Sequence, residues 1–247
     1  MSNPHVRLGE LGQSPWYDNI TRDLITSGRL ARLIHDDGLR GMTSNPTIFE
    51  KAVAGTDVYD ETIRKAMDEG KEADAIFETI AVADVRSACD VFRPVYDRTG
   101  GVDGLVSIEV SPTLSHDTKG TIAEAERLWR SVDRPNLMVK IPGTAEGLPA
   151  ITHCLAAGIN INITLLFAVE RYAEVIDAFL VALEQRVAKN QPIDRLASVA
   201  SFFGSSVDSN VDPQLDGQGD PNGIRGTIAI ANAAMAYHLF EQTLGKE

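Results

Sequence analysis

The sequence has little cysteine and little positive charge, and each shortage excludes a class of protein. Its two cysteines, Cys89 and Cys154, lie in helical patterns without metal-ligand spacing, so buried free thiols are expected rather than a disulfide or a zinc site. With 23 Lys and Arg against 35 Asp and Glu, the net charge of −12 argues against nucleic acid and anionic membrane surfaces as partners.

Long apolar runs are also missing. None approaches the roughly 20 residues that cross a bilayer, and the first residues lack the apolar stretch of a signal peptide. No low-complexity segment or linker divides the chain, so we expect residues 1–247 to form one domain. These features predict a cytoplasmic protein that acts on small molecules.

Six apolar, β-rich runs alternate with longer helical patterns, which is typical of a parallel sheet with crossover helices. The expected strands are Trp16 to Ile20, Gly41 to Asn45, Gly104 to Val110, Asn136 to Ile141, Ile159 to Phe167, and Leu196 to Phe203. The expected helices cover residues 22–36, 47–68, 72–97, 117–132, 145–156, 168–189 and 222–244, and a polar, acidic loop is expected over 212–223. The length of 247 residues suits an α/β fold of the TIM (β/α)8 barrel type, here with about six recognisable β/α units.

Lys140 stands in the middle of one of these expected strands, where a charge needs a reason. It shares a strand face with Met138, and it points inward if both faces of the sheet are covered. Attack of an amine on a carbonyl needs the neutral form, whereas a free lysine has a pKa near ~10.4, and burial favours the neutral form. The alternatives are a lysine that snorkels from the strand end and one that a carboxylate neutralises for structure alone.

Polar residues stand near the carboxyl end of every expected strand, which is where a (β/α) barrel gathers its active site. They are Asp18, Thr43, Ser44, Asn45, Glu109, Lys140, Asn162, Thr164 and Ser201. Glu109 interrupts an apolar strand, and a buried carboxylate needs a partner, for which Lys140 on the next strand is the obvious candidate.

Structural explanations exist for several of these residues taken singly. Asp18 or Asn19 could cap the following helix, and Asn45 could serve the turn before Pro46. Ser201 could satisfy a backbone group.

Five runs together resemble transaldolase, in order and at transaldolase spacing. They are Gly41 to Phe49, Val106 to Val110, Asn136 to Pro142, Gly158 to Phe167, and Ala200 to Phe203. The likeness extends from about Trp16 to Tyr237 and is closest to the longer bacterial type. It implies a class I aldol mechanism, which needs no metal and no other cofactor.

The resemblance implies a role for each residue of the reacting centre. Lys140 would form a Schiff base with C2 of a ketose donor. Asp18 matches the base that takes the C4 hydroxyl proton as the C3–C4 bond breaks and later returns it to the acceptor aldehyde. Glu109, with Thr164 and a water, matches the proton shuttle that forms and dehydrates the carbinolamine.

The remaining matches concern substrate binding. Asn45 and Asn162 resemble residues that hydrogen-bond the bound three-carbon fragment, and Thr43 is a neighbour of the site. Ser201 matches a donor to the C1 hydroxyl. Phe203 matches a wall position where phenylalanine goes with transfer and tyrosine with simple aldol cleavage, which favours a transferase.

The sequence departs from the family pattern after the sixth strand. Ser206 stands where the pattern has an arginine that clamps the sugar phosphate, and a serine offers no charged bidentate fork. Asp208, Asp212 and Asp216 would disfavour a dianion there. Lys119 and Arg225 are the nearest substitute cations.

The second departure is that strands seven and eight have no counterpart before Glu247. Six units do not close an eight-stranded barrel, and an open sheet exposes its edges. We therefore expect a domain that is incomplete at its C-terminal end. A partner subunit could fill the gap, the chain could be a fragment, or the last helix could fold across it; a homo-oligomer, with a dimer as the guess, is expected.

The leading hypothesis is a transferase that moves a dihydroxyacetone unit between sugars or sugar phosphates, within pentose phosphate metabolism or, because the phosphate end is changed, in a specialised pathway such as antibiotic sugar biosynthesis. The alternatives are a class I aldolase that releases dihydroxyacetone and a non-catalytic paralogue.

Overall fold

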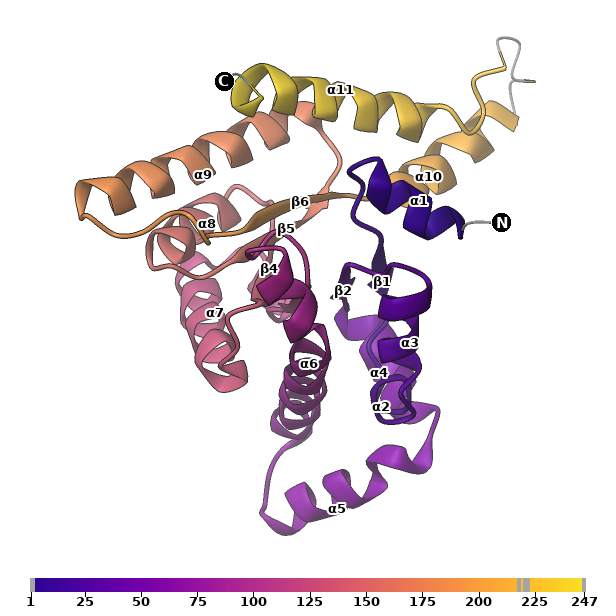
Figure 1. Cartoon of the computed structure of the whole chain (residues 1–247), viewed down its shortest axis with the longest axis vertical. Helices are drawn as coiled ribbons and strands as arrows, with labels where there is room; N and C mark the ends of the chain where they lie inside the picture. The colour runs from indigo at the N-terminus through magenta and orange to yellow at the C-terminus, as the bar shows by residue number, and fades with distance from the viewer. Residues whose placement is uncertain (1–2, 217–218, 220–222, 246–247) are drawn as a thin grey trace.

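The computed structural model describes residues 3–216, 219 and 223–245, apart from the side chains of Ile48, Ala52 and Asp216. Its centre is a parallel six-stranded sheet in the order β1-β2-β3-β4-β5-β6, which curls into a half-barrel (Figure 1). The strands are β1 (Trp16–Asp18), β2 (Gly41–Thr43), β3 (Leu105–Glu109), β4 (Leu137–Pro142), β5 (Ile161–Leu166) and β6 (Ser198–Phe202). The predicted barrel-type α/β fold with six β/α units is confirmed.

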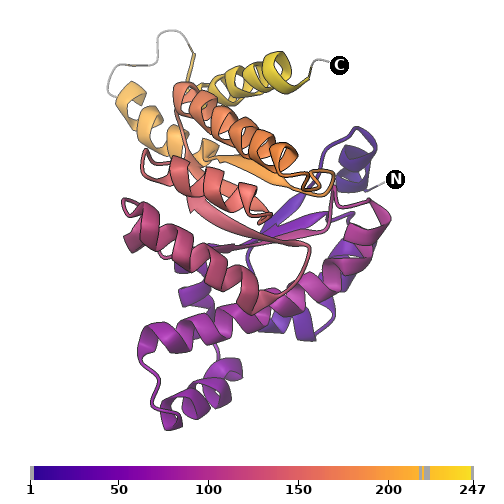
Figure 2. The same ribbon diagram turned by 90° about the vertical axis from the view of Figure 1, so that its left-hand side faces the viewer.

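Four long helices cover the outer face of the sheet side by side (Figure 2). They are α6 (Ala73–Arg98), α7 (Thr118–Val132), α8 (Gly147–Ala156) and α9 (Val169–Ala188). Each follows the predicted range within two residues, because a crossover helix shows its apolar stripe and its caps in the sequence. Asp117, for example, caps α7 by accepting a hydrogen bond from the Gly120 backbone amide at 3.0 Å.

Two predicted helices are broken in the structure. The range 22–36 divides into α2 (Arg22–Thr26) and α3 (Arg29–Asp36), because Gly28 between them has φ +74°, a left-handed value that no α-helix continues through. The range 47–68 divides into α4 (Pro46–Ala54), the 3₁₀ turn η1 (Asp57–Tyr59) and α5 (Asp60–Asp68).

The two ends of the chain differ most from the prediction. Helix α1 (Pro4–Glu10) was not expected; Asn3 caps it by accepting a hydrogen bond from the His5 amide at 3.0 Å. The predicted loop over 212–223 is wrong at 212–216, which end helix α10 (Gly204–Asp216), whereas 217, 218 and 220–222 lie outside the described residues. Of the helix predicted over 222–244, the structure has α11 (Ile228–Leu244).

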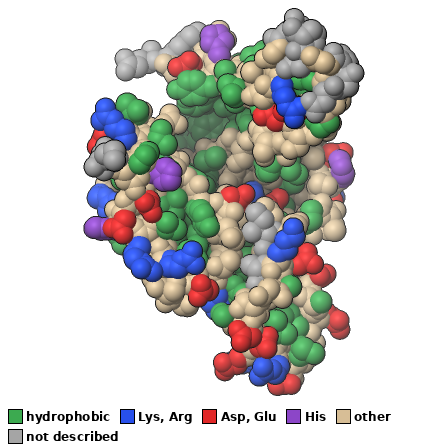
Figure 3. Space-filling model, turned by 90° about the vertical axis from the view of Figure 1, so that its right-hand side faces the viewer, with side chains coloured by type: hydrophobic (Ala, Val, Ile, Leu, Met, Phe, Trp, Pro, Cys, Tyr) green, Lys and Arg blue, Asp and Glu red, His purple; other side chains and the backbone are tan. Residues whose placement is uncertain are grey.

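The sheet ends at β1 on one side and at β6 on the other. Figure 3 faces the side of the molecule on which β1, α1 and α10 lie, and it shows a hollow with hydrophobic side chains gathered in it. Helix α11 packs along α9 (Figure 1).

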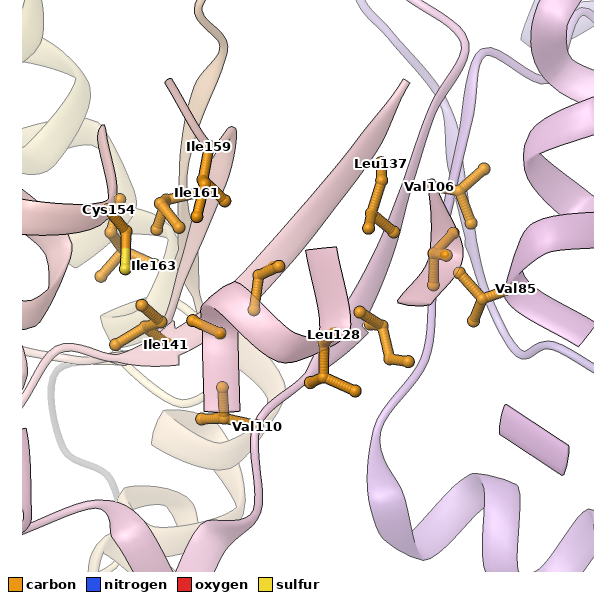
Figure 4. Packing of buried hydrophobic residues seen from close by; sticks show 14 of the residues in the cluster. Val85, Val106, Val110, Leu128, Leu137, Ile141, Cys154, Ile159, Ile161 and Ile163 are labelled. Atoms are coloured by element: carbon orange, nitrogen blue, oxygen red, sulfur yellow. The ribbon is translucent and has the colours of Figure 1, made fainter. Parts of the chain in front are cut away.

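The main core lies between the outer face of the sheet and the helices. Branched aliphatic side chains of the strands point at helical residues: Val106 lies beside Val85 of α6, and Ile161 lies beside Cys154 of α8 (Figure 4). Both cysteines are free and buried in this layer, as predicted. Within the described residues, no helix is long and apolar enough to cross a membrane.

A second apolar cluster fills the inner face of the half-barrel at the amino ends of the strands. Leu105 and Met138 are buried there together with Tyr96 of α6, and Trp16 and Val199 pack against them. The inner face therefore has an apolar floor, and its polar residues lie nearer the carboxyl ends of the strands.

Candidate active site

Strand alternation and register bring the polar side chains together on the inner face. Glu109 of β3 pairs with Lys140 of β4, and Lys140 pairs with Asn162 of β5. Pro142 pairs with Thr164, so Thr164 lies two residues nearer the carboxyl ends of the strands than Asn162 does. Four of the predicted catalytic and binding residues thus lie on three adjacent strands.

Lys140 is buried, with 4% of its surface exposed. Its Nζ lies 3.1 Å from Oε2 of Glu109 and donates a hydrogen bond to the backbone oxygen of Ser44 at 2.9 Å. The side chain does not snorkel to solvent, and the expected pairing with Glu109 is confirmed. Ser44 was not predicted as a contact of the lysine, since its carbonyl leaves no signal in the sequence.

Glu109 is held in an environment that disfavours its charge. Burial raises the pKa of its carboxyl, the ammonium of Lys140 opposes that shift, and the negative charge of Asp18 adds to it. A carboxyl with a raised pKa beside an amine holds a proton more readily than a free carboxyl does, which suits an acid or base.

A cavity of about 800 Å³ reaches Glu109 from the side. Its walls come from α4, α6, α7 and the residues that follow β3, and they include Phe77, Ile108 and Leu128. Arg127 of α7 lines it too and forms ion pairs with Glu78 of α6 and with Glu124. Water therefore has a space beside the end of β3.

Asn162 has a fixed orientation. Its Nδ2 donates to Oγ of Ser107 at 3.1 Å, and its Oδ1 accepts from Oγ of Ser201 at 2.7 Å. Ser201 therefore serves a side chain rather than a backbone group, and the structural explanation of Ser201 is wrong. Ser107 was missed by the sequence analysis, although it lies two residues before Glu109 and therefore on the same strand face.

Thr164 carries a buried hydroxyl without a hydrogen-bond partner among the described residues. The next residue, Leu165, has φ +59°, and the pairing of β5 with β6 shifts register between Ile163 and Leu166. Such irregularities aim a side chain away from the regular ladder. An unsatisfied buried hydroxyl of this kind suits a water or a substrate oxygen.

Asp18 ends β1 and pairs in register with Thr43 of β2. It is exposed, and it does not cap the next helix: Thr21 caps α2 by accepting from the Leu24 amide at 3.2 Å. The interpretation of Asp18 or Asn19 as a cap is therefore wrong. The backbone oxygen of Asn45 accepts a hydrogen bond from the amide of Phe49 in α4 at 3.0 Å, and a turn role for its side chain stays a prediction.

Phe203 follows β6 and is half-buried, with its ring 6.1 Å from the ring of Phe167. These two rings form an aromatic wall next to β6. Ser206 lies in the first turn of α10 and is exposed. It is not a member of the hydrogen-bond network of Ser107, Asn162 and Ser201.

The acidic residues near α10 have structural partners. Asp208 accepts a hydrogen bond from the Ala229 amide at 3.2 Å, and Asp212 accepts one from the Gly226 amide at 3.1 Å. Both carboxylates thus hold the start of α11 against α10; the side chain of Asp216 lies outside the described part. Lys119 and Arg225 are exposed.

No group of three or more His, Cys, Asp or Glu side chains in the described ranges could hold a metal ion. The inner face of the half-barrel instead offers the amine of Lys140, the carboxyl of Glu109 beside it, the exposed carboxylate of Asp18 at the end of β1 and several neutral donors. That set suits acid–base and covalent chemistry on a polar organic substrate.

Comparison with known proteins gives one family. Residues 15–246 match the model described as "Transaldolase/Fructose-6-phosphate aldolase". A "Transaldolase" of Frankia alni is 50% identical over 244 residues, which cover 98% of this chain and 66% of that protein. A "Transaldolase" of Trichodesmium erythraeum is 45% identical over 254 residues, which cover 99% of this chain and 67% of that protein.

A third relative, "Transaldolase 2" of Nostoc punctiforme, is 45% identical over 260 residues, covering 100% of this chain and 68% of that protein. The chain spans about two thirds of the length of the curated relatives it matches.

Proposed function

Because the chain belongs to the transaldolase/fructose-6-phosphate aldolase family, we propose that it moves a dihydroxyacetone unit from a ketose to an aldose through a Schiff base at Lys140. The observation that carries the proposal is the buried pair of Lys140 and Glu109, 3.1 Å apart. A buried lysine that has lost its chemistry has no reason to persist, since burying its charge costs several kcal/mol or more. That cost counts against a non-catalytic paralogue.

The pair supplies the first steps. A proton passes from the Lys140 ammonium to Glu109, and the neutral Nζ adds to the C2 carbonyl of the ketose. Glu109 then protonates the carbinolamine hydroxyl, which leaves as water, so that the imine forms. The raised pKa of Glu109 supports this role, because the carboxyl must hold a proton for part of the cycle.

Asp18 is proposed as the base of the carbon–carbon step. It takes the proton of the C4 hydroxyl as the C3–C4 bond breaks, and the electrons of that bond pass into the protonated imine. Its exposed position at the end of β1 supports contact with a substrate, and its negative charge helps to raise the pKa of Glu109. The enamine carbon then adds to the carbonyl carbon of the acceptor aldehyde, whose oxygen takes the proton back from Asp18, and water hydrolyses the new imine to release the product and free Lys140.

The neutral donors are proposed to hold the three-carbon fragment. Asn162 and Ser201 already form a hydrogen-bonded unit, and Asn162 pairs with Lys140 in the sheet. Thr43 at the end of β2 and Asn45 two residues later are proposed to bind the fragment with them. Thr164, whose hydroxyl is buried and unsatisfied, is proposed to hold the water that the carbinolamine releases.

Phe203 favours transfer over release of free dihydroxyacetone. Its ring packs with Phe167 and offers no hydroxyl that could orient a hydrolytic water in place of the acceptor. Ser206 in place of an arginine favours a specialised donor or acceptor over the sugar phosphates of the pentose phosphate pathway. Synthesis of an unusual sugar, as in antibiotic pathways, fits that change, and a cytoplasmic location and self-association remain part of the proposal.

The test traps the imine. The protein is incubated with fructose 6-phosphate, sedoheptulose 7-phosphate or unphosphorylated fructose, reduced with borohydride and mapped by mass spectrometry. We expect an adduct on Lys140 and none in Lys140→Met. Absence of an adduct with every ketose would refute the proposal, and dihydroxyacetone release that does not need an acceptor would favour the aldolase alternative.

A further inference from the structure

The strand that carries Asp18 gives this residue little support. Strand β1 is three residues long and lies at one edge of the sheet, where β2 is its one neighbour among the described strands. Asp18 is the last residue of β1 and is exposed. The place of its backbone therefore depends on the segment that follows it, residues 19–22.

That segment is anchored at its far end. Ile20 is buried in the main core, and α2 begins at Arg22. The backbone amide of Arg22 donates a hydrogen bond to the hydroxyl of Tyr59 in η1 at 2.9 Å. Amides in the first turn of a helix have no partner within that helix, so Tyr59 supplies an acceptor that α2 itself lacks.

The side chain of Arg22 binds two further elements. Its Nε donates to Oδ1 of Asp84 in α6, and its Nη1 donates to Oγ1 of Thr62 in α5, both at 2.9 Å. The Tyr59 hydroxyl in turn donates to Oδ2 of Asp84 at 2.9 Å, and the guanidinium lies 4.5 Å from the centroid of the Tyr59 ring. These four residues form the Arg22 cluster, in which both carboxylate oxygens of Asp84 have a donor.

The Arg22 cluster is deeply placed. Tyr59 and Asp84 are 1% and 3% exposed. A buried ion pair adds little net stability over apolar packing, because both charges lose water, whereas its directional hydrogen bonds select one geometry. Position therefore explains this cluster better than stability does.

The cluster also lies at the end of the sheet that matters for the site. Helix α2 follows β1, and η1 and α5 lie between β2 and α6. Arg22 therefore joins the segments that leave the carboxyl ends of two adjacent strands, which is the end where a (β/α) barrel places its active site.

We propose that Arg22 is a positioning residue for the carbon–carbon step. Held by Asp84 and Tyr59, it fixes the backbone after β1 and so places the Asp18 carboxylate, four residues earlier, for the C4 hydroxyl of the substrate. The inference rests on the proposed function, in which Asp18 is the base of that step. A displacement of a base by about 1 Å can slow a reaction by about 100-fold, so small movements of this segment matter.

The experiment separates two steps on the full chain with fructose 6-phosphate or fructose as the ketose. Borohydride trapping on Lys140 measures Schiff-base formation, in which Asp18 has no part, and release of the aldose measures cleavage of the C3–C4 bond. We expect Arg22→Lys, which keeps the charge and loses the planar fork, to slow cleavage by about tenfold to 100-fold and trapping by less than about twofold. The trapped adduct should shift in mass from the three-carbon fragment to the intact ketose.

Tyr59→Phe is the second variant, because it removes the hydroxyl and keeps the ring in place. We expect the same shift of the trapped adduct toward the intact ketose. Arg93→Lys is the matched control: Nε of Arg93 donates to Oδ1 of Asp97 at the same 2.9 Å, but on the exposed face of α6. It should leave both rates unchanged, and thermal melting confirms that each variant is folded.

A double-mutant cycle shows whether Arg22 acts through Asp18. In the Asp18→Asn background, Arg22→Lys should slow the residual cleavage by less than about twofold, because the group that it positions is gone. Equal slowing of trapping and cleavage, or an undiminished effect without the Asp18 carboxylate, would overturn the inference. If the parent forms no adduct, the proposed function fails and this inference with it, whereas an adduct in the parent with unchanged cleavage in both variants refutes the inference alone.

Discussion

Glu109 and Lys140 occupy paired positions on β3 and β4, and their charged atoms lie 3.1 Å apart in the interior of the half-barrel. Neither partner reaches this position by way of a loop, so the distance between them is set by the ladder of the sheet. Burial raises the pKa of the carboxyl while the ammonium opposes the shift. The carboxyl beside the amine is therefore easier to protonate than a free carboxyl.

The first prediction concerns Glu109→Gln, which keeps the shape and removes the proton carrier. We expect the rate of Schiff-base formation at Lys140 to fall by about 100-fold, the lower range for a general acid or base. Quench-flow borohydride trapping measures this rate, with ketose affinity measured separately by calorimetry. Glu146→Gln, at an exposed site, is the control, and an unchanged trapping rate would remove Glu109 from the mechanism.

The second prediction concerns the Arg22 cluster, a part-buried polar cluster that joins α2, η1 and α6. Asp84 accepts hydrogen bonds from Nε of Arg22 and from the Tyr59 hydroxyl, both at 2.9 Å, and the Arg22 guanidinium lies 4.5 Å from the Tyr59 ring centroid. Burial raises the pKa of Asp84 above 3.8, with Arg22 and Tyr59 opposing, and burial raises the pKa of Tyr59 to about 12.

A raised carboxyl pKa means that the folded state binds more protons than the unfolded state between 3.8 and the folded pKa. The contribution of Asp84 to the free energy of unfolding is therefore lost as the pH rises through that interval. We expect the stability difference between the parent and Asp84→Asn, measured by urea unfolding, to shrink as the pH increases there. A difference that grows with pH would mean that the Arg22 pair outweighs burial.

The central strands β3, β4 and β5 were predictable because they are buried almost throughout and therefore appear as apolar runs. Breaks between helices were harder to predict from the sequence. Residue type alone does not show that Gly28 takes φ +74° and separates two helices, whereas Gly147 is the first residue of α8. Helix α10 was missed because its polar residues resemble a loop, and its stability comes from contacts with α11, 14 to 21 residues later, such as the bond to Asp208.

The site divides in the same way. Lys140, Glu109 and Asn162 could be found because charged and amide side chains are rare on buried strands. The Ser44 carbonyl and the Ser107 hydroxyl could not, because their parts depend on the register between strands rather than on residue type.

The third prediction follows from the buried thiols. Burial raises the pKa of Cys89 and raises that of Cys154 to about 12, so neither supplies a reactive thiolate in the folded protein. Titration with an aromatic disulfide reagent should detect no thiol under native conditions and both in denaturant. Rapid labelling of the native protein would show that the α6 to α8 layer opens easily.

The fourth prediction tests the Ser201–Asn162 hydrogen bond. Ser201→Ala leaves Oδ1 of the buried Asn162 without its donor, which costs about 1–3 kcal/mol. Ser209→Ala removes an equally short bond to a backbone oxygen on the exposed surface of α10 and should cost far less. Equal losses in urea unfolding would mean that Asn162 readily finds another donor, so that the network does not position it.

The fifth prediction concerns the phosphate end of the substrate. Ser206→Arg, in the exposed first turn of α10, adds a bidentate cation next to the end of β6. A charged hydrogen bond is worth about 1.5–3 kcal/mol, so the KM for fructose 6-phosphate should fall by about tenfold or more while that for unphosphorylated fructose stays constant. Ser209→Arg, one turn further along the same exposed helix, adds the same charge away from β6 and is the control. If Ser206→Arg leaves both KM values unchanged, phosphate is bound elsewhere or is not part of the substrate. Ser206 would then go with a different substrate rather than with weaker binding of a sugar phosphate.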